Sequence, residues 1–315
     1  MRRCSTGGKN SAIVVGAASV VAYLASGNGR YLAVLPQQIF SRIDVFALMA
    51  MPLFILSGEI MNRGGVTRAL IRLSMAIVGR LPGGLGHVNI MTSVFFAGIS
   101  GSAVADAAAL SNTLVPSMRE QGYTNSYASA ITAASSIIGP IIPPSIVMIF
   151  YGALMNVSVA AMFAGGIVPG LLMALFLFGY NFWAAKREDN PGGAGVDLPP
   201  VGPTISRAAP ALLVPIVIVG GIVFGVVTPT EAAALAVAIT VILVVIYRVM
   251  DGKTPKEAFR HLMSEGSGAV DNAVMLTGSI FMILFAAAIF GYLIGIMQVP
   301  QAIAGMVSTL NLSAT

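Results

Sequence analysis

Long, continuous apolar runs constrain this chain more than any other feature of its sequence. The longest covers residues 127–155, and others cover residues 159–183 and 273–297. A helix needs about 20 apolar residues to cross the hydrocarbon core of a membrane, whereas barrel strands alternate apolar and polar positions. Only 9% of the residues are charged and 57% are hydrophobic. Because soluble domains carry about a quarter charged residues, the sequence predicts an all-α, multi-pass integral membrane protein.

The remaining segments suggest how the chain is divided. Six shorter apolar segments cover residues 11–25, 45–61, 88–99, 103–115, 211–227 and 232–247. Residues 184–209 are rich in proline, glycine and charge, which indicates a mobile polar loop between two halves. Residues 66–81 place Val66, Leu70, Leu73 and Ile77 at helical spacing, with arginines on other faces. This pattern predicts a connecting helix on the membrane surface.

The basic residues indicate how the segments cross the membrane. We assume that residues 88–115 form one re-entrant hairpin and that residues 127–155 form one broken span. Then 15 of the 17 lysines and arginines lie on one side, with only Arg30 and Arg42 opposite. If residues 127–155 formed two full spans, the split would be 8 to 9. The positive-inside rule favours the broken span and places the basic loops in the cytoplasm. It does not separate the hairpin from two full spans, because both return to the same side, but segments of about 12 or 13 apolar residues favour the re-entrant hairpin. The net charge of +5 therefore reflects orientation, and we expect no nucleic-acid partner.

The N-terminal region leaves two interpretations open. Arg2, Arg3 and Lys9 precede the apolar run, which fits either a signal peptide or a first span with a basic cytoplasmic flank. Cys4 is the only cysteine of this sequence, so neither an intrachain disulfide nor a cysteine metal cluster is expected within it.

A small, polar stretch, GISGSAVADAAALSN at residues 98–112, interrupts the apolar sequence. Its glycines and serines favour a turn inside the membrane, followed by a helix that begins near Ala103. The start of that helix suits an anionic group, and freed carbonyls and hydroxyls suit a sodium ion. Asp106 either supplies an oxygen ligand or stabilises the first turn of its own helix.

The same stretch also matches the G-x-S-G pattern of intramembrane serine proteases, with Ser100 as the nucleophile. Such a nucleophile needs a base, usually histidine, at membrane depth. The only histidines, His87 and His261, are predicted to lie in loops outside the spans. We therefore expect no enzyme.

A second interruption, SSIIGPIIPPSIVM, covers residues 135–148. Pro140, Pro143 and Pro144 remove hydrogen-bond donors and cannot continue a regular helix, whereas a simple kink needs only one proline. We predict an unwound segment near the membrane midplane that faces the first interruption. The candidate ion and substrate site comprises Ser100, Gly101, Ser102, Asp106, Ser135, Ser136, Gly139, Pro140, Pro143, Pro144 and Ser145, with Na⁺ at Ser100, Ser102, Asp106 and Gly139.

Other polar residues in apolar surroundings are predicted to be structural. Glu59 is expected to pair with or cap a neighbouring helix, and Glu231 to cap the helix that starts after Thr228 and Pro229. Tyr180 and Trp183 fit an interfacial belt.

A weak internal repeat relates the two halves. When Gly58 is aligned with Gly291, an offset of 233, a glycine, a valine and an alanine coincide within 13 positions. Repeated halves are common in secondary transporters. A second hairpin tip would then fall near position 100 + 233 = 333, beyond Thr315, so we interpret the sequence as a partial copy of a longer protein.

The two interruptions together identify a family. FFAGISGSAVADAAALSNTLVPSM followed by GYTNSYASAITAASSIIGPIIPPS closely resembles the large membrane subunit, the DctM-like or M subunit, of tripartite ATP-independent periplasmic (TRAP) transporters. MPLFILSGEIMNRGG and TPTEAAALAV are also typical of that family. The resemblance extends over residues 38–304.

The resemblance implies a sodium-coupled, elevator-type secondary transporter with inverted repeats, in the inner membrane of a bacterium. Its implied partners are a small membrane (Q) subunit, a periplasmic substrate-binding (P) protein, the lipid bilayer and a small carboxylate such as a C4-dicarboxylate or sialic acid. Sodium is the only expected coupling ion, and no cofactor is expected. The expected parts are scaffold spans and an arm helix at 1–86, transport elements at 87–158 (hairpin 87–119, broken helix 125–155), a span at 159–183, the linker 184–209 and a second repeat at 210–315.

Two alternatives to this function remain. The first is a related sodium and organic-anion symporter that works without a binding protein. The second is a membrane scaffold that does not transport.

Overall fold

The computed structural model of the chain describes residues 4–25, 27, 29–187 and 198–309, without the side chains of residues 4–11, 30, 31, 42, 100, 259 and 307–309. This part of the chain is helical and contains no strand. The helices are α1 Cys4–Ala25, α2 Leu35–Ile43, α3 Ala50–Arg63, α4 Val66–Val78, α5 Gly84–Ser100, α6 Ala103–Glu120, α7 Asn125–Ser136, α8 Ile146–Met155, α9 Val159–Arg187, α10 Val201–Val223, α11 Pro229–Met250, α12 Pro255–Ile296 and α13 Val299–Thr309, with 3-10 helices η1 Gly29–Val34 and η2 Phe46–Met49.

Four helices, α9 to α12, are long and apolar enough to cross a membrane, and there is a fifth span if α2 and α3 are taken together. Two other apolar helices, α5 and α8, have only 17 and 10 residues. Ten residues are too few for a complete crossing, and 17 lie at the lower limit for one. The predicted all-α, multi-pass membrane protein is therefore confirmed.

The chain forms two compact units, and the boundary between them falls inside α12. One unit is Phe46–Ala273, and the other combines Met1–Val45 with Val274–Thr315. In the unit that combines Met1–Val45 with Val274–Thr315, a small core is formed by Tyr23, Leu35 and Leu293. The Tyr23 hydroxyl donates to the carbonyl oxygen of Ile289 at 3.3 Å.

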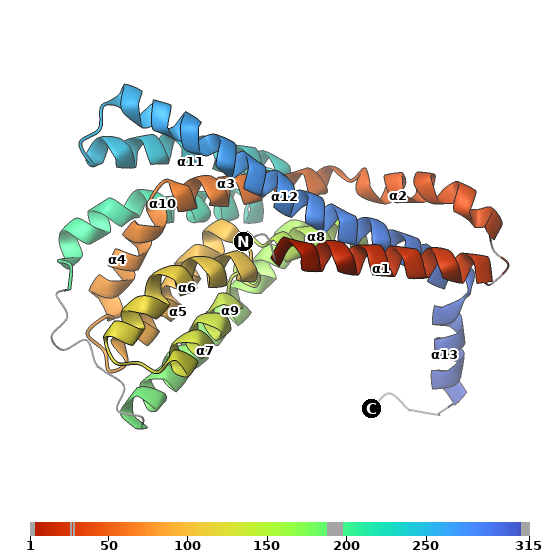
Figure 1. Cartoon of the computed structure of the whole chain (residues 1–315), viewed down its shortest axis with the longest axis horizontal. Coiled ribbons are helices and arrows are strands. Elements are labelled where there is room, and N and C mark those ends of the chain that lie inside the picture. Colours follow the sequence, from red (N-terminus) through yellow and green to blue (C-terminus); the bar gives the residue numbers. More distant parts are fainter. Residues whose placement is uncertain (1–3, 26, 28, 188–197, 310–315) are drawn as a thin grey trace. The chain divides into compact units, whose positions relative to one another are not determined.

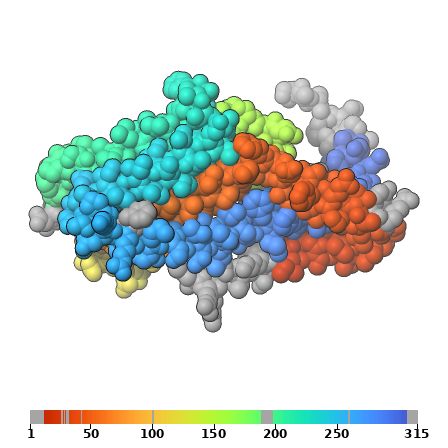
Figure 2. All heavy atoms as spheres, turned by 90° about the horizontal axis from the view of Figure 1, so that it is seen from above, coloured from red at the N-terminus to blue at the C-terminus, as the bar shows by residue number. Residues whose placement is uncertain are grey.

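In the unit Phe46–Ala273, α5 is the central helix and contacts α4, α6, α7 and α9 (Figure 1). The core around it is formed by apolar side chains of α4 to α7 and α9, among them Ile71, Val88, Ile90, Leu110, Leu114, Ile131, Ile138 and Ala174. On another side of the same unit, α3 packs along α11 (Figure 2). Side chains of α3 also form hydrogen bonds to the first half of α12. The central position of α5 holds the small, polar stretch at its end inside the unit.

The predicted surface helix exists as α4. Leu70 and Leu73 are buried, whereas Arg68 and Arg72 are exposed. Ile77 differs from the expectation, because it is 48% exposed. The helix packs against α5 and α10, and these neighbours leave the face of Ile77 uncovered. Whether α4 lies on the membrane surface stays a prediction.

The loop predicted at residues 184–209 is shorter than expected. Helix α9 continues to Arg187 and α10 begins at Val201, while residues 188–197 lie outside the described part of the chain. Pro203 falls in the first turn of α10. Backbone N–H groups in a first turn have no partner within the helix, so a proline there costs no hydrogen bond. Two of the prolines that suggested a loop, Pro200 and Pro203, therefore mark the start of a helix.

The weak repeat has a counterpart in local structure. With the offset of 233, the start of α4 at Val66 corresponds to 66 + 233 = 299, and α13 begins at Val299. The end of α3 at Arg63 corresponds to 63 + 233 = 296, where α12 ends. Gly65 and Gln298, again 233 apart, both have positive φ, of 85° and 53°. The same helix–turn–helix unit thus occurs twice.

The acidic residues predicted to be structural have structural contacts. Glu59 lies 3.6 Å from the Arg63 guanidinium on its own helix and accepts from Asn272 of α12 at 3.4 Å. Glu231 and Thr228 form a complete capping box at the start of α11. Both predictions are confirmed. Tyr180 and Trp183 are more than half exposed, as an interfacial belt requires, but the belt itself stays a prediction.

Candidate ion and substrate site

The first interruption is a helical hairpin with a tight turn. Helix α5 ends at Ser100, the chain turns at Gly101 and Ser102, and α6 begins at Ala103. Gly101 has the left-handed φ of 58°, which glycine adopts without a steric penalty. The Ser102 hydroxyl accepts from the backbone N–H of Ala105 at 3.4 Å and so caps α6. The predicted turn and helix start are confirmed, whereas the side chain of Ser100 lies outside the described residues.

The second interruption is an unwound segment and not a kink. Helix α7 ends at Ser136, and α8 begins only at Ile146. The Ser145 hydroxyl accepts from the N–H of Met148 at 3.2 Å and donates to the carbonyl oxygen of Pro140 at 2.6 Å. The peptide bond between Pro143 and Pro144 is cis. One serine thus caps α8 and binds a carbonyl of the unwound segment.

The two interruptions touch each other through their backbones. A Cβ atom on Gly101 would lie 2.5 Å from the carbonyl oxygen of Pro144 and 3.2 Å from the Cα of Ser145. No side chain fits at Gly101, so only glycine permits this contact. Because Ser102 caps α6 and Ser145 caps α8, the N-termini of two helices converge at this point. Each carries a partial positive charge from its aligned peptide dipoles.

Asp106 connects the hairpin to the unwound segment. It lies in the first turn of α6 and is fully buried. A Cβ atom on Gly139 would lie 2.4 Å from Oδ2 of Asp106. The carboxylate therefore sits against the backbone of the second interruption. This position is compatible both with an ion ligand and with a group that stabilises the start of α6.

A buried chain of hydrogen bonds also joins α5 to α7. The Asn89 amide donates to the Thr132 hydroxyl at 2.6 Å, and the Ser135 hydroxyl donates to the Asn89 carbonyl oxygen at 3.2 Å. Ser136 donates to the backbone carbonyl of Thr132 at 2.7 Å. The serines Ser135 and Ser136 thus bond within α7 and to α5. Sequence reasoning missed Asn89 and Thr132, although an amide inside an apolar run is a signal in its own right.

The base of the hairpin is attached to α9 by a second amide. Asn181, which is fully buried, donates to the carbonyl oxygen of Gly83 at 3.2 Å and accepts from the Tyr127 hydroxyl. A Cβ atom on Gly86 would lie 2.1 Å from the Asn181 side-chain oxygen. This contact anchors the starts of α5 and α7 to one point of α9.

An apolar cavity of about 430 Å³ lies beside the contact of the two interruptions. Its walls come from α5, the unwound segment, α9 and α10, and are formed by Val94, Phe95, Gly98, Ile142, Pro143, Ile167, Leu212, Pro215, Ile216, Val219 and Gly220. Pro215 packs directly on Gly98, where a Cβ atom would lie 2.6 Å from the proline ring. None of the residues that line the cavity is charged.

The protease interpretation is excluded by the position of the histidines. Contrary to the expectation of a loop, His87 lies in the first turn of α5, where it is buried and stacks on Phe178 with ring centroids 5.2 Å apart. Ser100 is 13 residues further along the same helix, about 20 Å away at 1.5 Å per residue. His261 lies in α12. The described residues also contain no group of three His, Cys, Asp or Glu side chains for a metal ion.

These features define a class of protein: a multi-pass helical membrane protein whose discontinuous helices meet inside the fold, as they do at the binding sites of secondary transporters. Comparison with known proteins is consistent with this class. Residues 6–315 match the model of the family described as the tripartite ATP-independent periplasmic transporter, DctM component. The chain belongs to this family.

Several curated relatives carry the same kind of name. The chain is 34% identical over 292 residues to the sialic acid TRAP transporter large permease protein SiaM of Vibrio cholerae, which is 92% of this chain and 66% of the relative. It is 36% identical over 279 residues to the 2,3-diketo-L-gulonate TRAP transporter large permease protein YiaN of Escherichia coli, covering 88% of this chain and 63% of the relative. It is 34% identical over 277 residues to the C4-dicarboxylate TRAP transporter large permease protein DctM of Pseudomonas aeruginosa, covering 88% and 62%.

The chain spans less than two thirds of the length of these relatives. All three are named as transporter permeases and none as an enzyme. The family expected from the sequence is therefore confirmed.

Proposed function

We propose that this chain is the part of a secondary transporter's large permease that contains one half of an ion and substrate site. The protein would import a small organic anion, driven by sodium. The observation that carries this proposal is the contact of Gly101 with Pro144 and Ser145, which brings the N-termini of α6 and α8 together beside the buried Asp106.

Converging helix starts favour an anionic substrate. The free N–H groups and the partial positive charge at a helix N-terminus bind carboxylate and phosphate groups without a basic side chain. Residues 98–112 and 135–148 contain no lysine or arginine. The relatives' names include sialic acid, 2,3-diketo-L-gulonate and C4-dicarboxylate, which differ in skeleton but share a carboxylate. The substrate class that follows is a small organic acid.

The oxygen atoms at the contact suit a sodium ion. Hard cations are coordinated by carboxylate, carbonyl and hydroxyl oxygens. Ser102 offers a hydroxyl at the hairpin tip, Asp106 a carboxylate in the first turn of α6, and Pro144 a backbone carbonyl in the unwound segment that contacts Gly101. Bound sodium would neutralise Asp106 and allow the substrate anion to approach the helix starts. Coupling would follow because the site closes only when ion and substrate are both present.

We further propose the assembly that the family implies. The chain would lie in a bacterial inner membrane with its basic loops in the cytoplasm, and it would work with a small membrane subunit and a periplasmic binding protein that delivers the substrate. The alternative is a symporter of the same superfamily that takes its substrate directly from solution. Uptake with and without the binding protein separates the two.

The test is sodium-dependent uptake into proteoliposomes. The protein is expressed from its complete reading frame with the small subunit, reconstituted, and supplied with radiolabelled organic acids and the binding protein. We expect uptake that requires a sodium gradient and is abolished by Asp106→Ala, with expression and membrane insertion unchanged.

Asp271→Ala is the matched control, because Asp271 is exposed on α12. It should leave uptake unchanged. Wild-type rates in Asp106→Ala would refute the assignment of the site, and uptake that ignores sodium in the wild type would refute the coupling.

A further inference from the structure

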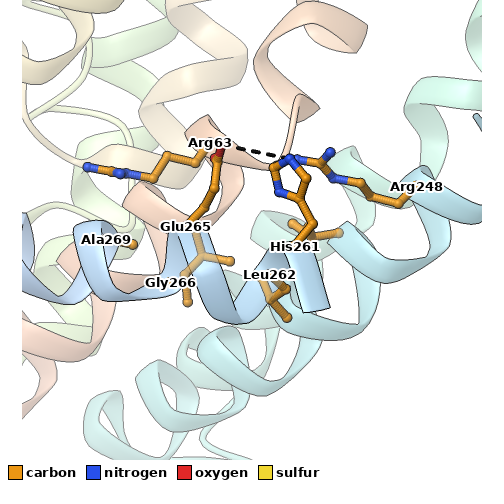
Figure 3. Close-up of a pocket in the computed structure, with 10 residues that line it drawn as sticks. Arg63, Arg248, His261, Leu262, Glu265, Gly266 and Ala269 are labelled. Carbon is orange, nitrogen blue, oxygen red and sulfur yellow. Dashed lines mark ion pairs between the residues drawn. The ribbon is translucent and has the colours of Figure 1, made fainter. Parts of the chain in front are cut away.

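The apolar cavity beside the two interruptions has room for a ligand of its own. Its volume is about 430 Å³, and none of its lining residues has a polar side chain. A second hollow, between α3, α11 and α12, is lined by the charged residues Arg63, Arg248 and Glu265 (Figure 3). That hollow has a volume of only about 10 Å³, which is the space of one water molecule. Of these two spaces, only the apolar cavity can admit a molecule larger than water.

The apolar cavity lies at the depth of the hydrocarbon core. Its wall on α10 runs from Leu212 to Gly220, about 12 Å at 1.5 Å per residue. These residues lie about 5–17 Å from the end of α10 at Val223, and Ile167 lies about 12 Å from the start of α9. Both helices are long and apolar enough to cross a membrane. The surroundings of the cavity at this depth are therefore the acyl chains of lipids.

In the described part of the chain, the cavity is open on one side and closed on the other. Ile216 lines it and is 65% exposed, which marks the open side. Gly98 and Pro143 are buried, and the ring of Pro215 packs on Gly98. These three residues close the cavity where α5 meets α10. A molecule in it would therefore come from the lipid around α10.

A space of this kind favours hydrocarbon over water. Apolar cavities stay dry because water finds no polar partners in them, and an empty cavity destabilises a fold in proportion to its volume. A cavity of about 150 Å³ admits a benzene molecule, which has six carbons. On the same scale, 430 Å³ has room for roughly 15 carbon atoms, the size of one acyl chain.

We infer that the cavity binds one acyl chain of a membrane phospholipid. The chain enters past Ile216 and lies along α10 between Leu212 and Gly220, while the headgroup stays outside the cavity. An ion or an organic anion does not suit these walls, because a buried charge needs polar partners. The inference is independent of the proposed sodium and substrate site, because it depends on the walls of the cavity and not on the two helix starts.

The test uses a phosphatidylethanolamine with a photoreactive diazirine near the middle of one acyl chain. The protein is expressed from its complete reading frame with the small subunit, reconstituted into nanodiscs with this lipid and illuminated. Labelled peptides are then identified by mass spectrometry. We expect adducts on Phe95 of α5, which lines the cavity and is only partly exposed, as well as on Val217 on the outer face of α10. Labelling of Val217 without labelling of Phe95 would overturn the inference, whatever else fills the cavity.

Two neighbouring leucines of α10 provide matched variants. Leu212 lines the cavity, whereas Leu213 is 56% exposed and does not. Leu212→Trp should lower the labelling of Phe95 relative to Val217 about ten-fold, because overpacking the cavity opposes binding of a chain. Leu213→Trp should leave this ratio unchanged. An unchanged ratio in Leu212→Trp would also overturn the inference.

Two further measurements separate the acyl chain from other causes. Leu212→Ala enlarges the cavity and should retain the labelling of Phe95, so the binding is still tested if Leu212→Trp folds poorly. A phosphatidylethanolamine with the diazirine in its headgroup should leave Phe95 unlabelled. Equal labelling of Phe95 by both lipids would refute the assignment of the cavity to an acyl chain.

Discussion

Replacing Gly139 by alanine tests the contact between the two interruptions most directly. A Cβ atom at this position would lie 2.4 Å from Oδ2 of Asp106, whereas ordinary contacts begin at 3.4 Å. The carboxylate or the unwound segment must therefore move by about 1 Å, the difference between these distances. Overpacking of this kind costs about 1–3 kcal/mol of the free energy of unfolding. A site that needs defined geometry also suffers when one of its groups moves by 1 Å, a displacement that lowers the rate of an enzyme roughly 100-fold.

The assay follows thermal unfolding of the purified protein with and without sodium. A loss of about 1–3 kcal/mol lowers the midpoint by several degrees in a protein of this size. If Asp106 binds sodium, the ion should raise the midpoint of the wild type and have a smaller effect on Gly139→Ala, because a ligand stabilises only the state that binds it.

Gly165→Ala in α9 is the control, since nothing lies within 4 Å of a Cβ atom there. It should leave both the midpoint and the response to sodium unchanged. The same result for Gly139→Ala would refute the close approach of Asp106 to the second interruption. A lower midpoint with a full sodium response would keep the contact but refute Asp106 as a ligand.

Two further predictions concern stability. Asn89→Ala should lower the free energy of unfolding by about 1–3 kcal/mol, because it removes the two buried hydrogen bonds of the Asn89 amide to Thr132 and Ser135 that join α5 to α7. Asn112→Ala on the exposed face of α6 should have little effect in the same thermal assay. At the start of α12, hydrogen bonds from Thr254 hold the pKa of Glu257 below its ordinary value. Stability from this carboxylate is therefore present above its unfolded pKa of about 4.3 and is lost as the pH falls through the lower folded pKa. Glu257→Gln should remove that part of the acid dependence, and an identical pH profile of the midpoint in both proteins would contradict it.

Much of the architecture could be predicted from local sequence signals. Run length predicted the membrane helices, since the bilayer thickness sets a minimum length that composition alone satisfies. The two interruptions were predicted from the prolines at 140, 143 and 144 and from the pair Gly101–Ser102. Proline and glycine alter the conformations and hydrogen bonds that the backbone can adopt wherever they occur. Thr228 and Glu231 predicted a helix start for the same reason. Each of these features involves only neighbouring residues.

Other features were missed or misplaced because they depend on distant residues. His87 was expected in a loop, but α5 begins at Gly84 and buries it against Phe178 of α9. Ile77 has the spacing of a core residue, yet no neighbouring helix covers it. Asn89 and Asn181 gave only a general signal of polar groups in apolar surroundings. Their bonds to Ser135 and Gly83 span 46 and 98 residues.

The sequence by itself determined that the chain is a membrane protein, where its helices break, and which family it belongs to. Only the tertiary structure decided that the breaks touch, that the carboxylate of Asp106 lies on Gly139, and that an apolar cavity lies between α5, α9 and α10. The physical reason is that hydrophobic length, proline and glycine act within a few residues of the chain. Contacts between helices depend on which faces pack together, and a single sequence does not specify this until the whole unit has folded.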